Sequence, residues 1–332
     1  MTRRHEHLDE DDVRVRPGRG KSRARSKVRP VHSDVVEAMV TTVDRGRFTT
    51  ASLLEPLQRV YAVKARELGR KGVVVGDRVD LVGDITGGPD ARARIVRRHG
   101  RTTVLRRSAD DSDPVERVVV ANADRIAVVV AAADPEPRPR LIDRTIVAAL
   151  DGGLEPLLII TKTDLAPPDP LLELYRPLGI PVLSRAKGDP LDDVLHELQG
   201  HATVLLGHSG VGKSTLVNSV VPDADRATGV VNEVTGRGRH TSTSAIAFAL
   251  REGGWLIDTP GIRSFGLGHV DLSRFMHAFP DLEAGTAQCP RGCTHDDDHC
   301  ALDDYVAEGK ADAGRLVSLR RLLASRSADD GD

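Results

Sequence analysis

The chain has 332 residues, of which 39% are hydrophobic and 29% are charged, and its formal net charge at pH 7 is -2. This length suits two or three domains, and the small net charge excludes nucleic-acid binding through overall charge, so any basic surface must be local. The longest apolar run, IAVVVAAA, is too short to span a membrane and the N-terminus lacks the apolar stretch of a signal peptide, so we expect a cytoplasmic protein with no membrane partner.

Residues 1–36 form the first segment, which opens acidic and turns basic in RVRPGRGKSRARSKVR. Proline and glycine interrupt any periodicity there, so we expect a disordered basic tail. Residues 37–110 contain short β-type runs, such as AMVTTV and VVVGDRVDLVG, separated by glycine and polar turns. This spacing predicts a small β-barrel, with an OB-fold as the preferred five-stranded version.

The last part of the predicted barrel is rich in arginine. Its run ARARIVRRHGRTTVLRR contains seven arginines, whereas Phe48 and Tyr61 are the only aromatic residues before the acidic hinge ADDSDPVE. We therefore expect contacts with RNA phosphates and RNA shape, strongly weakened by salt, rather than base stacking. A solvated charged face is the alternative.

Residues 111–271 alternate apolar strands with helical stretches, as in RVVVANADRIAVVVAAA, LIDRTIVAALDGG, LEPLLIITKTDL and ATVLLGHSGVGKSTLVNSV. This alternation predicts a doubly wound parallel α/β sheet. Residues 272–332 carry a Cys/His cluster and the amphipathic run RLVSLRRLLASR, which together predict a mainly helical, metal-binding domain. The predicted fold class is a multidomain α/β protein.

A phosphate-binding loop is predicted where the strand ATVLL meets the helical run LVNSV. The glycines of GHSGVGKST let backbone amides wrap phosphates at a helix N-terminus, the lysine faces the β and γ phosphates, and the serine hydroxyl is placed for Mg²⁺. A glycine-rich turn that binds nothing is the alternative. The loop comprises Gly207, His208, Ser209, Gly210, Val211, Gly212, Lys213, Ser214 and Thr215.

Two further segments are expected to face the same phosphates. DTPG follows the strand WLI, so Asp258 is predicted to lie near the metal and the amide of Gly261 near the γ-phosphate. Between these motifs, GRGRHTSTS from Gly236 is a glycine-rich loop with hydroxyl groups. Either Thr241 or Thr243 is the candidate switch threonine on Mg²⁺, with Thr241 preferred.

TKTD ends an apolar strand and lies upstream of the phosphate loop, the reverse of the usual order in GTPases. Ligand loops of a parallel sheet gather at the carboxyl edge of its strands, so a circular permutation preserves their arrangement. We expect Asp164 to accept hydrogen bonds from guanine and the aliphatic part of the Lys162 side chain to cover the base. Ser184, at the end of the next strand, is expected to contact the base as well. Thr161 and Thr163 belong to the same predicted binding loop as Asp164. A polar loop without a ligand is the alternative.

The three cysteines of the chain fall within twelve residues, which favours a metal site in a reducing compartment over a disulfide framework. Their spacing with one histidine supplies three thiolates and an imidazole for a tetrahedral structural Zn²⁺. His299 also lies within reach of the ion. The predicted ligands are Cys289, Cys293, His295 and Cys300.

Together, the permuted TKTD, LSRA, GHSGVGKST, GRGRHTST and DTPG set and the terminal CPRGCTHDDDHC resemble the RsgA/YjeQ family of circularly permuted GTPases that depend on the small ribosomal subunit. The resemblance covers nearly the whole chain. It implies an OB-fold, a permuted GTPase domain and a zinc-binding domain, with a role in late maturation of the small subunit. Two departures are Thr161, where the family usually has Asn, and a metal loop one residue shorter between its first two cysteines and again before the last.

The resemblance implies GTP and Mg²⁺ as ligands, one structural Zn²⁺, and the small subunit and its rRNA as partners of a monomer that binds no DNA.

Many GTPases orient the attacking water with a glutamine where this chain has Ile262, so unaided hydrolysis should be slow. His240 is a candidate for orienting that water, beside Lys213 and Thr241, and an exposed loop histidine is the alternative. Two rival functions are a P-loop ATPase or kinase, and an RNA-binding assembly factor whose nucleotide site is only a binding switch.

Overall fold

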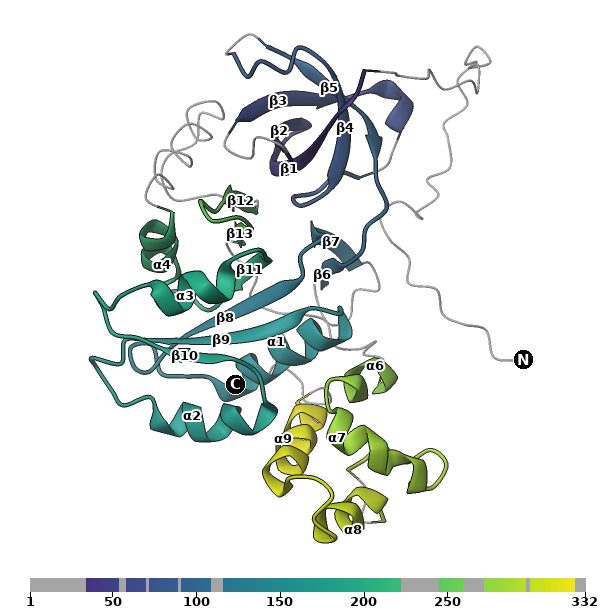
Figure 1. Cartoon of the computed structure of the whole chain (residues 1–332), viewed down its shortest axis with the longest axis vertical. Coiled ribbons are helices and arrows are strands. Elements are labelled where there is room, and N and C mark those ends of the chain that lie inside the picture. Colours follow the sequence, from purple (N-terminus) through teal and green to yellow (C-terminus); the bar gives the residue numbers. More distant parts are fainter. Residues whose placement is uncertain are drawn as a thin grey trace. The chain divides into compact units, whose positions relative to one another are not determined.

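The computed structural model describes residues 34–53, 58–69, 72–88, 91–108, 116–221, 245–259, 272–296 and 299–325. The chain divides into two compact units. Figure 1 shows the whole chain, coloured along its sequence from the N-terminus to the C-terminus. The barrel unit comprises residues 1–122 and 229–249, and the α/β unit comprises residues 123–228 and 250–332. Residues 1–33 of the predicted basic tail lie outside the described residues.

The barrel unit contains a closed β-barrel, as the sequence predicts. Antiparallel pairs join β1 to β2, β2 to β3 and β4 to β5; β3 and β5 run parallel, and β4 closes the barrel by pairing with β1. The 3-10 turn η1 (Arg66–Leu68) follows β3, and β12 (Ile246–Ala249) pairs with β1. The barrel strands are β1 (Val36–Asp44), β2 (Arg47–Ser52), β3 (Arg59–Lys64), β4 (Arg78–Gly83) and β5 (Ala93–Arg98).

Alternation along the strands builds the barrel core. Residues two apart on one strand share a face, so every second side chain points inward. The inward positions are apolar and almost completely buried, and they include Ala38, Val40, Val60, Ala62, Val79, Leu81, Ala93 and Ile95. The preference of the sequence for an OB-type barrel is thereby confirmed in its strand pairing and its core.

A buried carboxylate supports the loop before β4. Asp77 is fully buried and accepts hydrogen bonds from the Arg101 guanidinium at 2.7 and 2.9 Å and from the Val74 amide at 2.8 Å. The neighbouring Gly76 has φ 87, and a Cβ atom there would lie 1.9 Å from the Ala121 carbonyl oxygen. Only glycine allows this approach of the loop to the hairpin of β6 (Val104–Ser108) and β7 (Glu116–Ala121).

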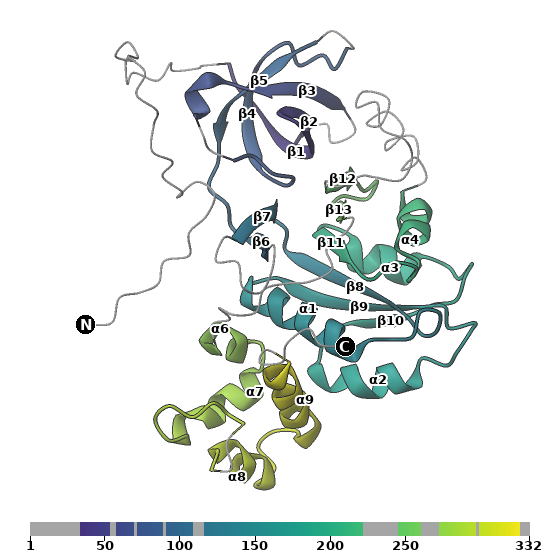
Figure 2. The ribbon, with the colours of Figure 1, turned by 180° about the vertical axis from the view of Figure 1, so that it is seen from behind.

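The α/β unit is built on a parallel sheet with the strand order β10, β9, β8, β11, β13. All seven residues of β8 are buried, as expected for a parallel strand covered on both faces. Figures 1 and 2 show α1 and α2 on one face of the sheet and α3 and α4 on the other. The doubly wound fold predicted from the sequence is therefore confirmed.

Helices α1 and α4 fall in the predicted helical runs, whereas α2 and α3 were not predicted as separate runs. The strands are β8 (Arg125–Ala131), β9 (Glu155–Thr161), β10 (Val182–Ser184), β11 (Ala202–Leu206) and β13 (Trp255–Asp258). The helices are α1 (Pro139–Asp151), α2 (Asp169–Tyr175), the 3-10 turn η2 (Arg176–Leu178), α3 (Asp192–Leu198) and α4 (Lys213–Val220).

The strand order creates a crevice at the centre of the sheet. From β8 the chain proceeds outward to β9 and β10, whereas from β11 it proceeds in the other direction to β13. Since β8 and β11 are neighbours, the loops that leave their carboxyl ends diverge. Ligands of doubly wound sheets bind at such a switch point.

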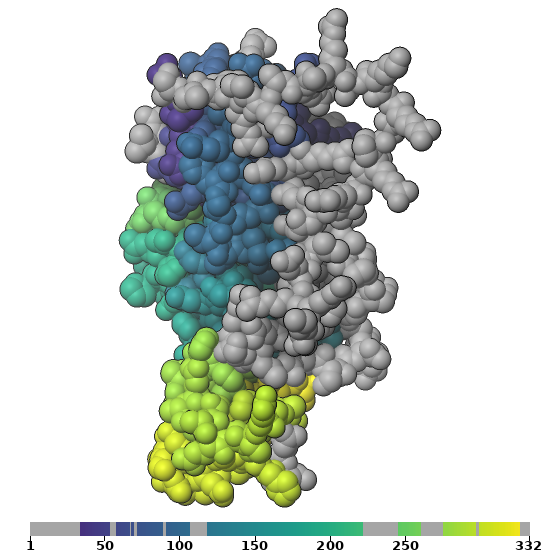
Figure 3. All heavy atoms as spheres, turned by 90° about the vertical axis from the view of Figure 1, so that its right-hand side faces the viewer, coloured from purple at the N-terminus to yellow at the C-terminus, as the bar shows by residue number. Residues whose placement is uncertain are grey.

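Residues after the sheet form a helical lobe, which is yellow-green in Figure 3. Phe275, Phe279, Leu302 and Leu319 are at most 1% exposed and form part of its core. Among the described helices of the whole chain, none is long and apolar enough to cross a membrane. The lobe contains α6 (Leu272–His277), α7 (Pro280–Glu283), η3 (Ala284–Gln288), α8 (Ala301–Ala307) and α9 (Ala313–Ala324).

Candidate functional site

The phosphate loop lies between β11 and α4, at the switch point of the sheet. Strand β11 ends at Leu206 and α4 begins at Lys213, so the glycine-rich segment makes the whole turn. Gly210 and Gly212 have φ 84 and 93, a conformation that residues with a Cβ atom rarely adopt. A Cβ atom on Gly207 would lie 2.3 Å from the Val129 carbonyl oxygen on β8. The glycine spacing is therefore required by this path of the backbone.

Lys213 opens α4 and turns back over the loop. Its ammonium donates to the carbonyl oxygens of Gly207 and His208, the latter at 3.2 Å. Burial lowers the pKa of Lys213, and the carboxylate of Asp258 opposes that shift. The Lys213 side chain is half-buried, and a phosphate oxygen could replace the carbonyl oxygens that its ammonium contacts.

Asp258 ends β13, beside the phosphate loop. Burial raises its pKa and the charge of Lys213 opposes the shift. The Oδ1 atom is buried and has no hydrogen-bond partner among the residues that the structure describes. Because an unsatisfied buried carboxylate oxygen is costly, this atom is suited to a cation or to water ordered by one.

A pocket of about 290 Å³ joins these groups. Lys213, Ser214 and Asp258 line it. Glu136 and Arg138, from the loop before α1, and Thr145, from the middle of that helix, also line it. Glu136 and Arg138 were not predicted as site residues from the sequence. Their position after β8, the strand beside the phosphate-loop strand, is the signal that could have identified them.

The predicted base-reading loop reaches the phosphate loop. Thr161 ends β9, and its hydroxyl lies 2.7 Å from the Val211 carbonyl oxygen and 3.1 Å from that of Val130. Lys162 follows with φ 57, and its ammonium donates to the Asp134 carbonyl oxygen. TKTD and GHSGVGKST, which are separated by about forty residues of sequence, are therefore in direct contact.

The end of β10 completes the rim. Ser184 is exposed there, and the Arg185 carbonyl oxygen accepts from the Thr163 amide at 3.3 Å. Asp164 is exposed, and one of its oxygens lies 3.4 Å from the Lys187 amide. Asp189, which was not predicted as a site residue, accepts a hydrogen bond from the Ala186 amide at 2.6 Å and fixes the turn. The signal for it was an aspartate after Lys-Gly, which is typical of turns.

Several predicted site residues lie in segments outside the described ranges. His240, Thr241 and the alternative Thr243 lie outside the described residues, and so do Gly261 and Ile262. Thr215 lies on α4 with an exposed side chain. The site assembled by the structure therefore consists of the phosphate loop, Asp258 and the loops after β9 and β10.

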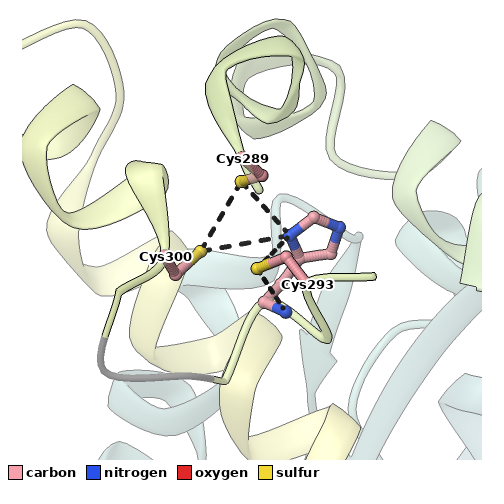
Figure 4. A group of neighbouring side chains, drawn as sticks. Cys289, Cys293 and Cys300 are labelled. Atoms are coloured by element: carbon pink, nitrogen blue, oxygen red, sulfur yellow. Dashed lines mark hydrogen bonds between the residues drawn. The ribbon is translucent and has the colours of Figure 1, made fainter. Parts of the chain in front are cut away.

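The four predicted metal ligands form one cluster in the helical lobe. Figure 4 shows the three cysteine side chains around one imidazole. Its Nδ1 atom, on His295, lies 3.7 Å from Cys289, 3.8 Å from Cys293 and 4.0 Å from Cys300, and the sulfurs of Cys289 and Cys300 are 3.8 Å apart. A tetrahedral zinc with bonds of about 2.3 Å separates its sulfur ligands by about 3.8 Å. The cluster fits such an ion.

The surrounding backbone supports this cluster. The His295 amide lies 3.3 Å from the Cys293 sulfur, and Arg320 of α9 donates to the His295 carbonyl oxygen at 3.1 Å. Arg320 also forms two hydrogen bonds of 2.7 Å with Asp303 of α8. His299, the alternative ligand, is exposed and is not among the four grouped side chains.

The chain matches known proteins over most of its length. The family model described as RsgA GTPase matches residues 98–268. A protein of Pseudomonas syringae pv. tomato named "Small ribosomal subunit biogenesis GTPase RsgA" is 44% identical over 269 residues, which are 77% of this chain and 76% of that protein. A protein of Ectopseudomonas mendocina with the same name is 43% identical over 222 residues, and the match spans 64% of each chain.

Two solved structures share the fold. YjeQ from Thermotoga maritima superposes with a TM-score of 0.63 at 24% identity, covering 88% of this chain and 98% of that one. YloQ, described as a circularly permuted GTPase, gives a TM-score of 0.64 at 22% identity, covering 92% and 98%. At sequence identities of 24% and 22%, these two matches support the arrangement of the strands and loops, and they assign no function to individual residues.

Proposed function

The chain belongs to the RsgA GTPase family, and on that premise we propose that it hydrolyses GTP in the late maturation of the small ribosomal subunit. The observation that carries this proposal is the contact of the TKTD loop with the phosphate loop, through the Thr161 hydroxyl and the Val211 carbonyl oxygen. One nucleotide could then contact both loops. The relatives, each named as a small ribosomal subunit biogenesis GTPase, supply the biological setting.

In this proposal the phosphates lie on the loop before α4. Backbone amides between Gly207 and Lys213 donate to the phosphate oxygens, and the ammonium of Lys213 replaces its carbonyl contacts with phosphate contacts. Guanine lies at the rim formed by the ends of β9 and β10. There Asp164 accepts from the ring N–H and the exocyclic amine, which adenine does not present together.

Ser214 and Asp258 are proposed to hold Mg²⁺. Both line the pocket of the phosphate loop. The Oδ1 atom of Asp258, which has no hydrogen-bond partner in the part of the chain that the structure describes, fits a role close to the cation. When bound, the cation would neutralise charge that develops on the phosphate oxygens during transfer to water. His240 stays the candidate that orients this water, and Thr241 stays the candidate switch threonine.

One structural zinc ion is proposed for the cluster of Cys289, Cys293, His295 and Cys300. Four protein ligands leave no open position, so the ion serves structure rather than chemistry. Its effect would be to hold α8 and α9 together, because Cys300 precedes α8 and Arg320 of α9 contacts the metal loop.

The small subunit and its rRNA are the proposed partners, and the cytoplasm is the proposed location. Arginines at the start of β5 support an RNA contact, because Arg92, just before the strand, and Arg94, on it, are exposed, while Ala93 and Ile95 belong to the barrel core. Arg101 is excluded from this surface since its guanidinium is paired with the buried Asp77. Binding through phosphates should weaken steeply as salt is raised.

A phosphate-release assay tests the function. Purified protein is given GTP or ATP, with and without purified small subunits, and Lys213→Ala serves as the matched control. We expect slow GTP hydrolysis that subunits accelerate at least tenfold, weak use of ATP, and no nucleotide-dependent signal from the control. Equal use of ATP would favour the P-loop ATPase, and nucleotide binding without stimulated hydrolysis would favour a binding switch.

A further inference from the structure

Thr161 ends the strand that carries TKTD, and its side chain is turned inward. The residue is 8% exposed, whereas Asp164 in the same loop is exposed. Its hydroxyl lies within hydrogen-bonding distance of two carbonyl oxygens, those of Val211 and Val130. A hydroxyl has one proton, so it donates to one of them at a time, and the shorter distance of 2.7 Å favours Val211.

We propose that Thr161 is a positioning residue that orients the phosphate loop and takes no part in recognition of the base. This inference rests on the proposed function, because it assumes that a nucleotide lies across both loops. It assigns base selectivity to Asp164 and phosphate affinity to the contact between Thr161 and the loop.

The peptide group that Thr161 contacts explains how one hydroxyl orients the loop. The Val211 carbonyl and the Gly212 amide belong to the same planar trans peptide, so their C=O and N–H bonds point in opposite directions. A hydrogen bond that draws the carbonyl oxygen toward β9 therefore points the Gly212 N–H away from it. Amides of such a loop are the donors that cradle phosphates at the start of the helix.

The loop needs this restraint because glycines flank the contact. Gly210 and Gly212 have φ 84 and 93, and glycine has more backbone freedom in the unbound state than any other residue. Val211 between them is 3% exposed, so its side chain and its carbonyl are both fixed against the sheet. Pre-ordering a binding loop raises affinity by reducing the entropy lost when the ligand binds.

The same geometry removes Thr161 from the base. Its single proton is directed to a carbonyl oxygen, and both oxygens within reach are acceptors, so no donor remains for a guanine acceptor. Loss of the Thr161 hydroxyl should therefore weaken the binding of guanine nucleotides and of adenine nucleotides by the same factor. Loss of the Asp164 carboxylate should weaken the binding of guanine nucleotides alone.

The test measures dissociation constants of GDP and ADP for the full chain and for three variants. Thr161→Val keeps the side-chain shape and removes the hydroxyl, Thr161→Ser restores the hydroxyl, and Asp164→Ala removes the base acceptor. We expect Thr161→Val to raise the dissociation constants of GDP and of ADP about tenfold each. For Thr161→Ser, both dissociation constants should stay within about threefold of those of the natural chain. Asp164→Ala should reduce the GDP to ADP preference at least tenfold.

Hydrogen exchange at residues 208–214, measured without nucleotide, gives an independent readout. Thr161→Val should accelerate this exchange, and Asp164→Ala should leave it unchanged. Unchanged GDP affinity in Thr161→Val, or a fall in its GDP to ADP preference, would overturn the positioning role. The proposed function fails separately, if the natural chain shows no preference for GDP over ADP. Thr161→Ala, measured in the same way, replaces Thr161→Val if that variant does not fold.

Discussion

Arg321 on α9 contacts α1 and the end of α2, and its removal should weaken the attachment of the helical lobe to the parallel sheet. Its Nε atom lies 3.0 Å from an oxygen of Asp143, and its Nη1 atom donates to the Leu174 carbonyl oxygen at 3.0 Å. The guanidinium also lies 5.0 Å from the centroid of the Tyr175 ring. The Asp143 side chain is 4% exposed and the Arg321 side chain is 23% exposed.

The expected cost of Arg321→Met at pH 8 is about 3 kcal/mol. Breaking a buried ion pair by removal of one partner costs about 3–5 kcal/mol, because the remaining charge is buried without compensation. Loss of the contact with the Tyr175 ring adds to this, while partial exposure of Arg321 and the space for water left by methionine reduce it. In the double variant Asp143→Asn/Arg321→Met, no buried charge remains, so we expect recovery of roughly half of the loss.

The stability lost in Arg321→Met should depend on pH, with a direction set by the pKa of Asp143. Burial raises the pKa of Asp143 above its usual value, and the charge of Arg321 opposes that rise. An acid with a raised pKa in the folded state contributes stability that is present at low pH and is lost as pH rises through that pKa. Arg321→Met removes the opposing charge and raises this pKa further. Its destabilisation should therefore be smaller at pH 6 than at pH 8, and the double variant should not show this difference.

The assay is urea unfolding of the full chain at both pH values, followed by the fluorescence of Trp255, the single tryptophan of the chain. Hydrogen exchange in residues 313–324 reports the detachment of α9 if the units unfold separately. Equal stability of Arg321→Met and the natural chain at pH 8 would refute the assignment of a stabilising contact. Equal destabilisation at pH 6 and pH 8 would refute the buried carboxylate as its cause.

Three further outcomes are expected. Chelation of zinc, or Cys300→Ser, should release about one metal ion per chain and accelerate hydrogen exchange in residues 289–325 while the parallel sheet keeps its protection; unchanged exchange would contradict a structural ion. Asp77→Ala should destabilise the barrel by about 3 kcal/mol because it removes a buried carboxylate that accepts hydrogen bonds from the Arg101 guanidinium and the Val74 amide. The exposed control Arg94→Ala should cost less than about 0.5 kcal/mol, with both variants measured by thermal unfolding. Lys213→Ala should weaken GDP binding by about 100-fold or more in calorimetry, and a loss below fivefold would exclude contact of this ammonium with phosphate.

Much of the fold was predictable because local patterns determine it. The apolar runs of the parallel strands, the alternation in the barrel strands and the glycines of the phosphate loop reflect what each backbone segment requires from its own residues. The cluster of three cysteines and one histidine was predictable for the same reason, since all four side chains come from one short stretch around Cys289 and Cys300. The sequence alone also predicted that TKTD and GHSGVGKST meet, because parallel strands direct their ligand loops to one edge.

Contacts between distant residues depended on the tertiary structure. The pairing of Thr161 with Val211, of Arg101 with Asp77 and of Arg321 with Asp143 joins residues that no local pattern relates. The sequence grouped Arg101 with arginines expected at an RNA surface, and the structure buries it against a carboxylate. A side chain's partner depends on the path of the whole chain, whereas its backbone preference depends on its near neighbours. Residue types and spacing therefore determined which chemistry the chain carries, and the packing of distant segments decided which side chains are free to perform it.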